Sequence, residues 1–388
     1  MKKIFVTTPI YYVNDIPHIG HAYTTISCDI IARYNRMLGN EVFFLTGTDE
    51  HGQKVENAAS LKSLKPQDFV DKISKSFKDL IPFLNCSIDD FIRTTEERHK
   101  IAAQALWKKL LNNNQIYLSN YEGWYSVRDE AFYSENELTK KNDKFIAPSG
   151  AEVEWVKEES YFFKLSEWED KLIDFYEKNK ESILPKTRYN EVLSFIKSGL
   201  RDLSISRTTF KWGIPVPDNE KHVMYVWIDA LCNYLTAIGF PDENNEKFKK
   251  FWPGIHIVGK DILRFHSVYW PAFLLAADLE PPKKVFAHGW WTNEGEKISK
   301  SVGNIINPYE IVTRYGLDQI RYYLFREVPF GNDGDFSNNS IVTRINADLS
   351  NNFGNLVQRI CSFVKKNCES KILSDFDLDN VEDKELLN

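Results

Sequence analysis

Hydrophobic residues in the first part of the chain alternate between strand-like and helix-like spacing. Residues 4–10 form an apolar run that predicts a buried strand, residues 19–38 repeat apolar positions at helical spacing, and residues 41–46 predict a second strand. A strand, a helix and a strand within about 45 residues form a βαβ unit, which implies a parallel sheet. Helical spacing returns at 66–84 and 95–113.

The pattern changes at residue 115. Aromatic and charged residues then mix in short irregular runs, and helical spacing is evident only at 161–182 and 189–201. Two apolar strands that end in glycine follow, at 255–259 and 285–289. We therefore expect an α/β fold with a Rossmann-like parallel sheet split by an insertion, and a ligand site at the carboxyl ends of its strands.

The α/β pattern ends after residue 325, and residues 346–366 have the spacing of an amphipathic helix. No further helices follow that would cover its apolar face, so we expect the natural protein to continue past residue 388. The predicted divisions are the first half of a Rossmann-like catalytic domain (1–114), an inserted α+β connective domain (115–225), the second half of the catalytic domain (226–325), a linker (326–345) and the start of a helical bundle (346–388).

Composition narrows the class of protein. The net charge of −6 gives no overall sign of nucleic-acid binding. Residues 178–211 carry eight Lys or Arg against three Asp or Glu, which by itself is most simply a solvated helix face. The five cysteines include no C-x-x-C pair, which argues against a zinc knuckle and against a disulfide framework. No apolar segment has the length of a membrane span, and we expect a cytoplasmic protein.

Two imidazoles and a glycine stand where the first strand leads into the first helix. His18, Gly20 and His21 follow Pro17, so they fall at the helix start, where backbone N–H groups and the helix dipole favour phosphate. His18 and His21 are three residues apart and share one face. Gly20 has no Cβ and would let a flat adenine lie close to the backbone. The alternative is a purely structural role, with a pair of capping histidines beside a turn glycine.

A second candidate lies nearly 280 residues further on. Lys297, Ser299 and Lys300 occupy a polar loop between Gly295 and Gly303. Lysine ammonium groups supply point charge to the β- and γ-phosphates as pyrophosphate leaves. Alone, this loop is more simply a solvated basic turn. Together, the two segments favour a site that splits ATP to adenylate a carboxylate.

Both segments resemble the paired signatures of class I aminoacyl-tRNA synthetases, with Ile298 where that family usually has Met. The runs at 46–52, 225–230 and 259–266 narrow the resemblance to the methionyl-tRNA synthetases. The resemblance covers most of the chain. It implies activation of L-methionine by ATP to methionyl-adenylate and pyrophosphate, followed by transfer of methionine to the 3′ end of tRNA(Met).

The resemblance also implies roles for individual residues. His18, His21, Lys297 and Lys300 are the expected catalytic set. Asp49 and the backbone of Ile10 are expected to hold the methionine ammonium, and Arg207 matches a basic residue that faces the site. The thioether is expected to lie among Tyr12, Trp227, Leu231, Tyr234, Phe265 and His266, with Leu231 where the family often has Pro. The expected ATP contacts are His18, Gly20, His21, Gly259, Asp261, Trp291, Lys297, Ser299 and Lys300.

The metal expectations differ between the two domains. Mg²⁺ is expected to arrive with ATP rather than in a protein cage. The insertion of many methionyl-tRNA synthetases carries zinc knuckles, and residues 121–133 resemble that region. Asp129 stands where a cysteine might be expected, however, and no cysteine lies between residues 87 and 231. We therefore predict an insertion without zinc and no metal site in the protein.

The resemblance implies that tRNA contacts the insertion and the helix that begins near Asn346, the start of an anticodon-binding domain. The basic stretch 178–211 is then expected to face the acceptor stem, and the protein is expected to be a monomer. Two alternatives remain. One is a different enzyme, either another class I synthetase or a small-molecule nucleotidylyltransferase, which shares the first motif. The other is a non-catalytic RNA-binding paralog on the same scaffold.

Overall fold

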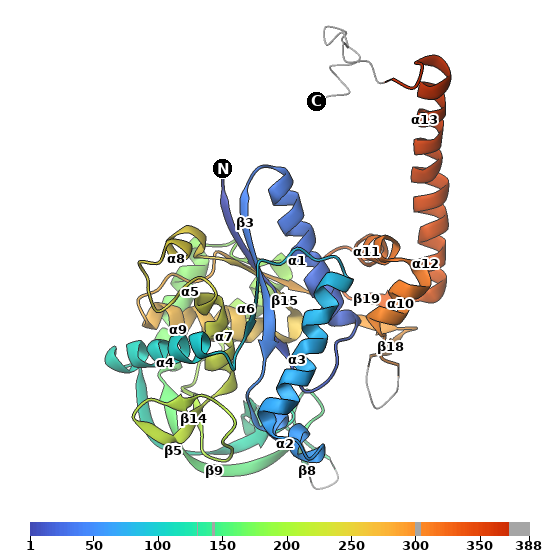
Figure 1. The fold of residues 1–388 in the computed structure, drawn as a ribbon. Coiled ribbons are helices and arrows are strands. Elements are labelled where there is room, and N and C mark those ends of the chain that lie inside the picture. Colours follow the sequence, from blue (N-terminus) through green and yellow to red (C-terminus); the bar gives the residue numbers. More distant parts are fainter. Residues whose placement is uncertain (130, 142–143, 299–303, 372–388) are drawn as a thin grey trace.

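The computed structural model describes residues 1–129, 131–141, 144–298 and 304–371, and its centre is a parallel β-sheet (Figure 1). Every strand pair in this sheet is parallel, as the βαβ pattern predicts. In spatial order the strands are β10 (Ile183–Leu184), β16 (Lys284–His288), β15 (Ile255–Gly259), β1 (Lys3–Thr7), β3 (Glu41–Asp49) and β2 (Tyr11–Tyr12), and β4 (Asp90–Arg93) also pairs with β3.

Helices cover both faces of this sheet. Successive side chains of its strands point in opposite directions, so each face carries side chains that pack against helices. Phe5 and Leu45 pack on one face with α4, α7 and α9, whereas Val6 and Phe44 pack on the other face with α1. Burial on both faces explains why these strands are continuously apolar. The helices around the sheet are α1 (Ile19–Met37), α2 (Gln53–Leu61), α3 (Pro66–Phe83), α4 (Glu97–Asn112), α7 (Val226–Thr236), α8 (Glu246–Phe251) and α9 (Trp270–Ala276).

Three details differ from the sequence pattern. β1 ends at Thr7 rather than at residue 10, before Pro9, which lacks the N–H that a ladder needs. β3 continues to Asp49 because β4 pairs with its second half. The predicted apolar stripe of α1 is only partly buried: Ile26 is in the core, but Met37 near its end is 85 % exposed.

The insertion is a second, mainly antiparallel sheet. Its main element is the long antiparallel pair of β5 and β9, which Figure 1 shows at the bottom of the molecule. The predicted helix over 161–182 is wrong at its start, because β9 continues to Phe163 and only Glu169–Lys178 is α-helical. The strands are β6 (Ala131–Tyr133), β5 (Ile116–Ser126), β9 (Glu152–Phe163), β8 (Lys144–Ile146) and β7 (Thr139–Lys141), with β11 (Leu203–Ser204) beside β9.

Smaller elements connect the insertion to the parallel sheet. Although β10 lies within the segment predicted as an insertion, it forms the edge of the parallel sheet beside β16. The connecting elements are α5 (Glu169–Lys178), α6 (Lys186–Lys197) and a three-stranded sheet of β12 (Ser206–Arg207), β14 (Asn219–Met224) and β13 (Pro215–Val216). The short helical turns are η1 (Glu135–Glu137), η2 (Leu165–Trp168), η3 (Lys260–Ile262) and the π-helical η4 (Phe265–Tyr269).

The C-terminal part begins with a small sheet and ends in a long helix. The helix starts at Asn338, eight residues earlier than the sequence predicts, and continues as a π-helical stretch into α13, which stands away from the body in Figure 1. At its foot the Asn338 N–H donates to Glu294 Oε1 at 3.4 Å. The elements are β17 (Trp291–Asn293), β18 (Glu296–Lys297), α10 (Pro308–Tyr315), α11 (Leu317–Arg326), β19 (Gly334–Phe336), α12 (Asn338–Arg344), η5 (Ile345–Gly354) and α13 (Asn355–Asn367).

Leu356, Ile360 and Phe363 lie on the apolar face of α13, and Phe353 lies just before this helix. All four side chains are exposed. Among the helices in the described ranges, none combines the length and apolar composition needed to cross a bilayer.

Candidate active site

The two histidines of the first motif cap the helix that they introduce. His18 is the N-cap of α1, and its Nδ1 accepts from the Gly20 N–H at 3.1 Å, while His21 Nδ1 accepts from the His18 N–H at 3.0 Å. The ring centroids are 3.9 Å apart. Because each Nδ1 accepts a hydrogen bond, the neutral form of each ring carries its proton on Nε2. Capping therefore uses Nδ1 of each imidazole and not the nitrogen that carries the proton.

The surroundings of this helix start favour an anion. The first turn of α1 contains no acidic residue, so nothing on the helix itself neutralises the positive end of its dipole. Gly20 is required for the cap itself, since a Cβ at this position would lie 2.9 Å from His18 Cε1. The structure thus gives this glycine a steric role that the sequence did not reveal.

The segments on either side of the lysine loop lie against the same helix start. The Ile19 N–H donates to Ile306 O at 3.0 Å, and Ile298 packs on a buried cluster that includes Ile19, Tyr23 and Trp291. Lys297 is the last residue of β18. Ser299 and Lys300 lie outside the described residues, so the predicted contacts of these two residues stay predictions.

The carboxyl ends of β15 and β16 reach this helix start as well. Gly259 pairs with His288, whose Nε2 is 2.8 Å from Thr24 Oγ1, one helical turn after Gly20. Asp261 follows Gly259 and is exposed, with its Oδ1 accepting from Trp290 Nε1–H at 3.2 Å. The strand ends, Asp261 and α1 therefore form one side of the candidate site.

The predicted methionine pocket is assembled from two helices. Trp227 on α7 stacks on Phe265 of η4, with centroids 3.6 Å apart and planes 7° from parallel. One turn and two turns further along α7, Leu231 and Tyr234 are buried. The Tyr234 hydroxyl is 2.8 Å from His266 Nε2. Sulfur packs well against aromatic edges, so this wall suits a thioether.

Burial sets the protonation of the two polar groups in this pocket. Burial lowers the pKa of His266 to about 4, against a smaller effect of the hydrogen bond between its Nδ1 and the Ile262 carbonyl. Burial also raises the pKa of Tyr234 well above its usual range. The pair is therefore neutral at pH 7: the Tyr234 hydroxyl donates to Nε2, and Nδ1–H donates to Ile262 O.

β2 connects the two sides of the site. Tyr11 lies beside His21, with ring centroids 4.9 Å apart and its hydroxyl donating to the His21 carbonyl at 3.2 Å. The neighbouring Tyr12 pairs with Asp49 at the end of β3. Ile10, Tyr12 and Trp227 all pack on the core cluster that contains Leu231 and Tyr234. β2 thus connects Asp49 both to the histidine pair and to the cluster that contains Leu231 and Tyr234.

Arg207 is almost completely buried at the boundary with the insertion. Its guanidinium donates to Ser204 Oγ at 2.8 Å and to Ser206 O at 2.6 Å, and it lies 4.4 Å from the ring centroid of Tyr225. Tyr225 is the N-cap of α7, so Arg207 borders the pocket helix. Its expected role toward substrate stays a prediction.

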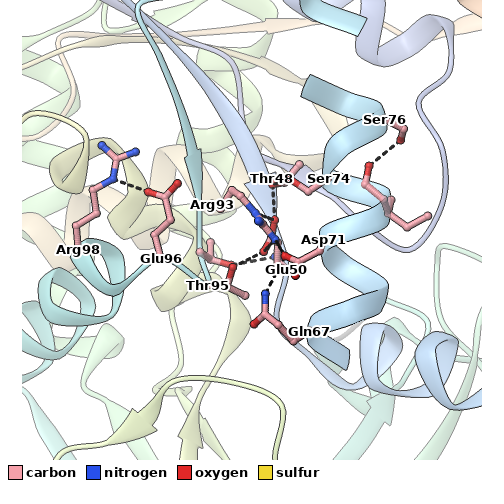
Figure 2. Close-up of polar contacts among 12 residues, drawn as sticks. Thr48, Glu50, Gln67, Asp71, Ser74, Ser76, Arg93, Thr95, Glu96 and Arg98 are labelled. Atoms are coloured by element: carbon pink, nitrogen blue, oxygen red, sulfur yellow. Dashed lines mark hydrogen bonds and ion pairs between the residues drawn. The ribbon is translucent and has the colours of Figure 1, made fainter. Parts of the chain in front are cut away.

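Sequence reasoning missed the buried polar groups around Asp49. Glu50 is bound by Arg93, and His51 is bound by Asp229, which also binds His99 (Figure 2 for Glu50). Three of these residues lie in the runs that carry the family resemblance, at 46–52 and 225–230, but no local spacing indicates that they meet. Within the described ranges, no three His, Cys, Asp or Glu side chains are grouped as metal ligands. The zinc-free insertion stays a prediction.

Comparison with known proteins agrees with this geometry. The family model for tRNA synthetases class I (M) matches residues 4–361. Methionine–tRNA ligase of Rickettsia bellii is 61 % identical over 369 residues, which are 95 % of this chain and 72 % of that protein. The corresponding ligase of Brucella suis is 57 % identical over 373 residues, 96 % of this chain and 72 % of that protein.

Solved structures of a methionyl-tRNA synthetase from Mycobacterium tuberculosis have the same fold. The complex with methionyl-adenylate is 50 % identical with a TM-score of 0.95, and it matches all of this chain and 76 % of the solved one. The free form is 46 % identical with a TM-score of 0.86, over all of this chain and 74 % of the solved one. These matches show that this chain belongs to the methionine branch of the class I tRNA synthetases.

Proposed function

We propose that this chain activates L-methionine with ATP and then transfers the methionyl group to the 3′ end of tRNA(Met). The observation that carries the proposal is the position of β2. Tyr11 contacts the histidine pair at the helix start, and Tyr12 pairs with Asp49 beside the apolar pocket. An amino acid with its side chain in that pocket and its ammonium at Asp49 would present its carboxylate toward the start of α1, where the α-phosphate of ATP is expected.

Adenylate formation needs positioning and charge stabilisation rather than a general base. A methionine carboxylate oxygen attacks the α-phosphorus of ATP in line, an O–P bond forms, and the bond from phosphorus to the leaving pyrophosphate breaks. The carboxylate is already a nucleophile at neutral pH, so no proton has to be removed. Preorganised donors aimed at the developing charge are then the main catalytic contribution.

The chain supplies donors on both sides of that phosphorus. The Nε2–H groups of His18 and His21 and the N–H groups at the start of α1 serve the α-phosphate. Lys297 and Lys300 serve the β- and γ-phosphates, and Ser299 and the backbone of Trp291 contribute further ATP contacts. Gly259 and Asp261 take the ribose. Mg²⁺ would be held by the phosphates of ATP rather than by a cage of protein residues, and it would supply charge neutralisation for the pyrophosphate.

Transfer to tRNA uses the remaining parts of the chain. The insertion and the basic stretch 178–211 face the acceptor stem, and the long helix from Asn338 faces the rest of the tRNA. Phosphate contacts of this kind make binding weaken as salt increases. We keep the monomeric state and the cytoplasmic location as predictions.

The test is ATP–pyrophosphate exchange with the 20 standard amino acids supplied one at a time. This reaction needs only amino acid, ATP and Mg²⁺, so it reports adenylation independently of tRNA. We expect exchange with methionine and, since one methylene discriminates by about 1–3 kcal/mol, at most weak exchange with leucine and isoleucine. Equal exchange with several amino acids, or none with methionine, would contradict the proposal.

A further inference from the structure

Asp49 lies between buried polar groups that hold the chain on both sides of it. Residues 48–52 comprise the last two residues of β3 and the three that follow it. Thr48, Glu50 and His51 in this segment are each at most 4 % exposed. Main-chain bonds hold the segment too: the Val13 N–H donates to Asp49 O at 3.1 Å, and Trp212 Nε1–H donates to Glu50 O at 2.6 Å. Unlike Asp49, Glu50 and His51 have no role in the proposed reaction.

Glu50 is held by the strand next to β3. Arg93 of β4 donates to both of its carboxylate oxygens, from Nε at 2.7 Å and from Nη2 at 2.9 Å. The hydroxyls of Thr48 and Thr95 donate to the same carboxylate at 2.7 and 2.5 Å, as Figure 2 shows. A bidentate arginine fixes both the charge and the orientation of a carboxylate. Arg93 therefore neutralises Glu50, which would otherwise repel the neighbouring Asp49 and the methionine carboxylate.

His51 is held from the opposite direction by the pocket helix. Its Nδ1 lies 2.6 Å from Asp229 Oδ2, and the other oxygen of Asp229 lies 2.7 Å from His99 Nε2 of α4. His99 Nδ1 is in turn 3.1 Å from Thr236 Oγ1, at the end of α7. Asp229 and His99 are fully buried. Burial opposes the charged form of Asp229, but the two imidazoles outweigh it and lower the pKa of Asp229 to about 2.

The position of Asp229 gives this network a specific consequence. It lies on α7 between Trp227 and Leu231, which belong to the predicted thioether wall. A charge-assisted hydrogen bond that this carboxylate accepts from His51 joins the segment that carries Asp49 to the helix that carries that wall. The distance between the ammonium site and the thioether site is thereby set by a short, dry contact rather than by the flexibility of a loop.

We propose that Asp229 is a positioning residue for methionine binding: through His51, and with Glu50 held by Arg93, it fixes the Asp49 carboxylate relative to the pocket on α7. This inference rests on the proposed function, because it assigns a role toward the ammonium of the substrate. The residues named in it contact the segment that contains Asp49, and they do not contact the reacting atoms.

The test uses two ligands that differ in the ammonium group. Methioninol keeps the ammonium and the thioether, and 4-(methylthio)butanoate keeps the thioether but has no ammonium. Each is measured as a competitive inhibitor of methionine-dependent ATP–pyrophosphate exchange. For Asp229→Asn we expect the KM for methionine and the Ki of methioninol to rise about 10-fold, because a misplaced Asp49 loses part of a charge-assisted hydrogen bond. We expect the Ki of 4-(methylthio)butanoate and the KM for ATP to change less than about 2-fold.

Substitutions at His51 keep the test decisive if Asp229→Asn does not fold. His51→Ala removes the donor, and we expect the same selective loss of methioninol. His51→Asn places an amide N–H near the position of Nδ1, and we expect binding to recover to within about 3-fold of the wild type.

Asp89→Asn is the matched control. Asp89 also holds β3, since its Oδ2 accepts from the Phe44 N–H at 2.7 Å and from Arg36 at 2.6 Å, but it does so away from Asp49. This variant is expected to bind both inhibitors as the wild type does. If both inhibitors weaken equally in Asp229→Asn, or if neither does, the inference is overturned. If the wild type itself shows no methionine-dependent exchange, it is the proposed function that fails.

Discussion

The two sides of the site are built in opposite ways. On the side expected to hold methionine, Tyr234 and His266 are 1 % and 2 % exposed, and their polar atoms are hydrogen-bonded to each other and to the Ile262 carbonyl. On the side expected to hold ATP, Asp261 is exposed and Trp290 is 44 % exposed, and the donors proposed for the phosphates are half-buried imidazoles at a helix start. Choosing among apolar side chains needs a dry pocket of fixed shape, whereas phosphates need donors that remain open to solvent as ATP enters and pyrophosphate leaves.

The difference lies in the kind of interaction that each side uses. Apolar discrimination depends on contact area and on buried polar groups that reject a wrong partner. Phosphate binding depends on charge and on the helix dipole, which act over longer distances and tolerate water. Changes to the two sides should therefore give separable effects on methionine and on ATP.

The largest expected effect is the response of the methionine side to acid. The pKa of His266 is about 4 in the folded protein, because of burial, against about 6.5 in an unfolded chain. Between these values the unfolded chain binds a proton that the folded chain does not. Stability from this group is therefore complete above pH 6.5, and about 3 kcal/mol of it is lost as the pH falls to 4.

Urea unfolding at pH 7.5, 6.5, 5.5 and 4.5 measures this loss, with His266→Gln as the comparison. The glutamine can still accept from Tyr234 but does not titrate, so we expect the variant to lose less stability over this range. Parallel pH profiles for the two proteins would show that His266 does not carry the effect.

The next effect breaks the ATP side alone. We expect Lys300→Ala to slow adenylate formation about 10²-fold, or about 2.7 kcal/mol, as for removal of a donor that acts mainly in the transition state. Methionine binding should change little, since the role proposed for the lysine is toward the phosphates of ATP and not toward the amino acid. Single-turnover pyrophosphate release measures the rate, and equilibrium dialysis measures methionine binding. A wild-type rate would refute the assignment.

Gly20→Ala is expected to have a smaller effect on the same side. The added Cβ would lie 2.9 Å from His18 Cε1, so the ring must move out of its cap. We expect adenylate formation to fall about 10-fold, or about 1.4 kcal/mol, with no change in methionine affinity. Alanine stabilises a helix by about 1 kcal/mol relative to glycine. This gain opposes the cost of the displaced His18 cap, so thermal stability should change little. A slower rate together with a large loss of thermal stability would mean that the substitution disrupted the helix cap, and the rate would then not report on catalysis.

The smallest expected effect sharpens the methionine side. Tyr234→Phe removes the donor to His266 Nε2 and leaves a buried acceptor without its partner. We expect the KM for methionine to rise about 5-fold, or about 1 kcal/mol, while the KM for ATP stays as in the wild type. Steady-state exchange at varied concentrations of each substrate separates the two. An equal rise in both constants would contradict the division into two sides.

Sequence patterns predicted the parts of the site that depend on local structure. A strand, a turn and a helix start place His18, Gly20 and His21 by short-range spacing. Trp227, Leu231 and Tyr234 were expected from the family resemblance instead, and the pattern did not predict α7, the helix that carries them. The strand–helix–strand pattern also predicted a parallel sheet correctly. In each case the geometry follows from a few consecutive residues.

The network behind Asp49 depends on pairings that no local pattern contains. His51 and His99 reach Asp229 across 178 and 130 residues of sequence. The sequence pattern also did not predict the pairing of β5 with β9. Many side chains of these strands are exposed, so the strands lack the apolar alternation of a half-buried sheet. Long-range contacts of this kind become visible only when the chain is folded.

The continuous helix from Asn338 to Asn367 has a mechanical consequence. A helix of this length is a rigid arm of roughly 40 Å, so a tilt of about 5° at one end moves the other end by about 3 Å. The near end of the arm is bonded to Glu294, in the turn of the β17–β18 hairpin that leads directly into the lysine loop. Because the near end is bonded to Glu294, a sideways push on the far tip would act on the β17–β18 hairpin as a torque.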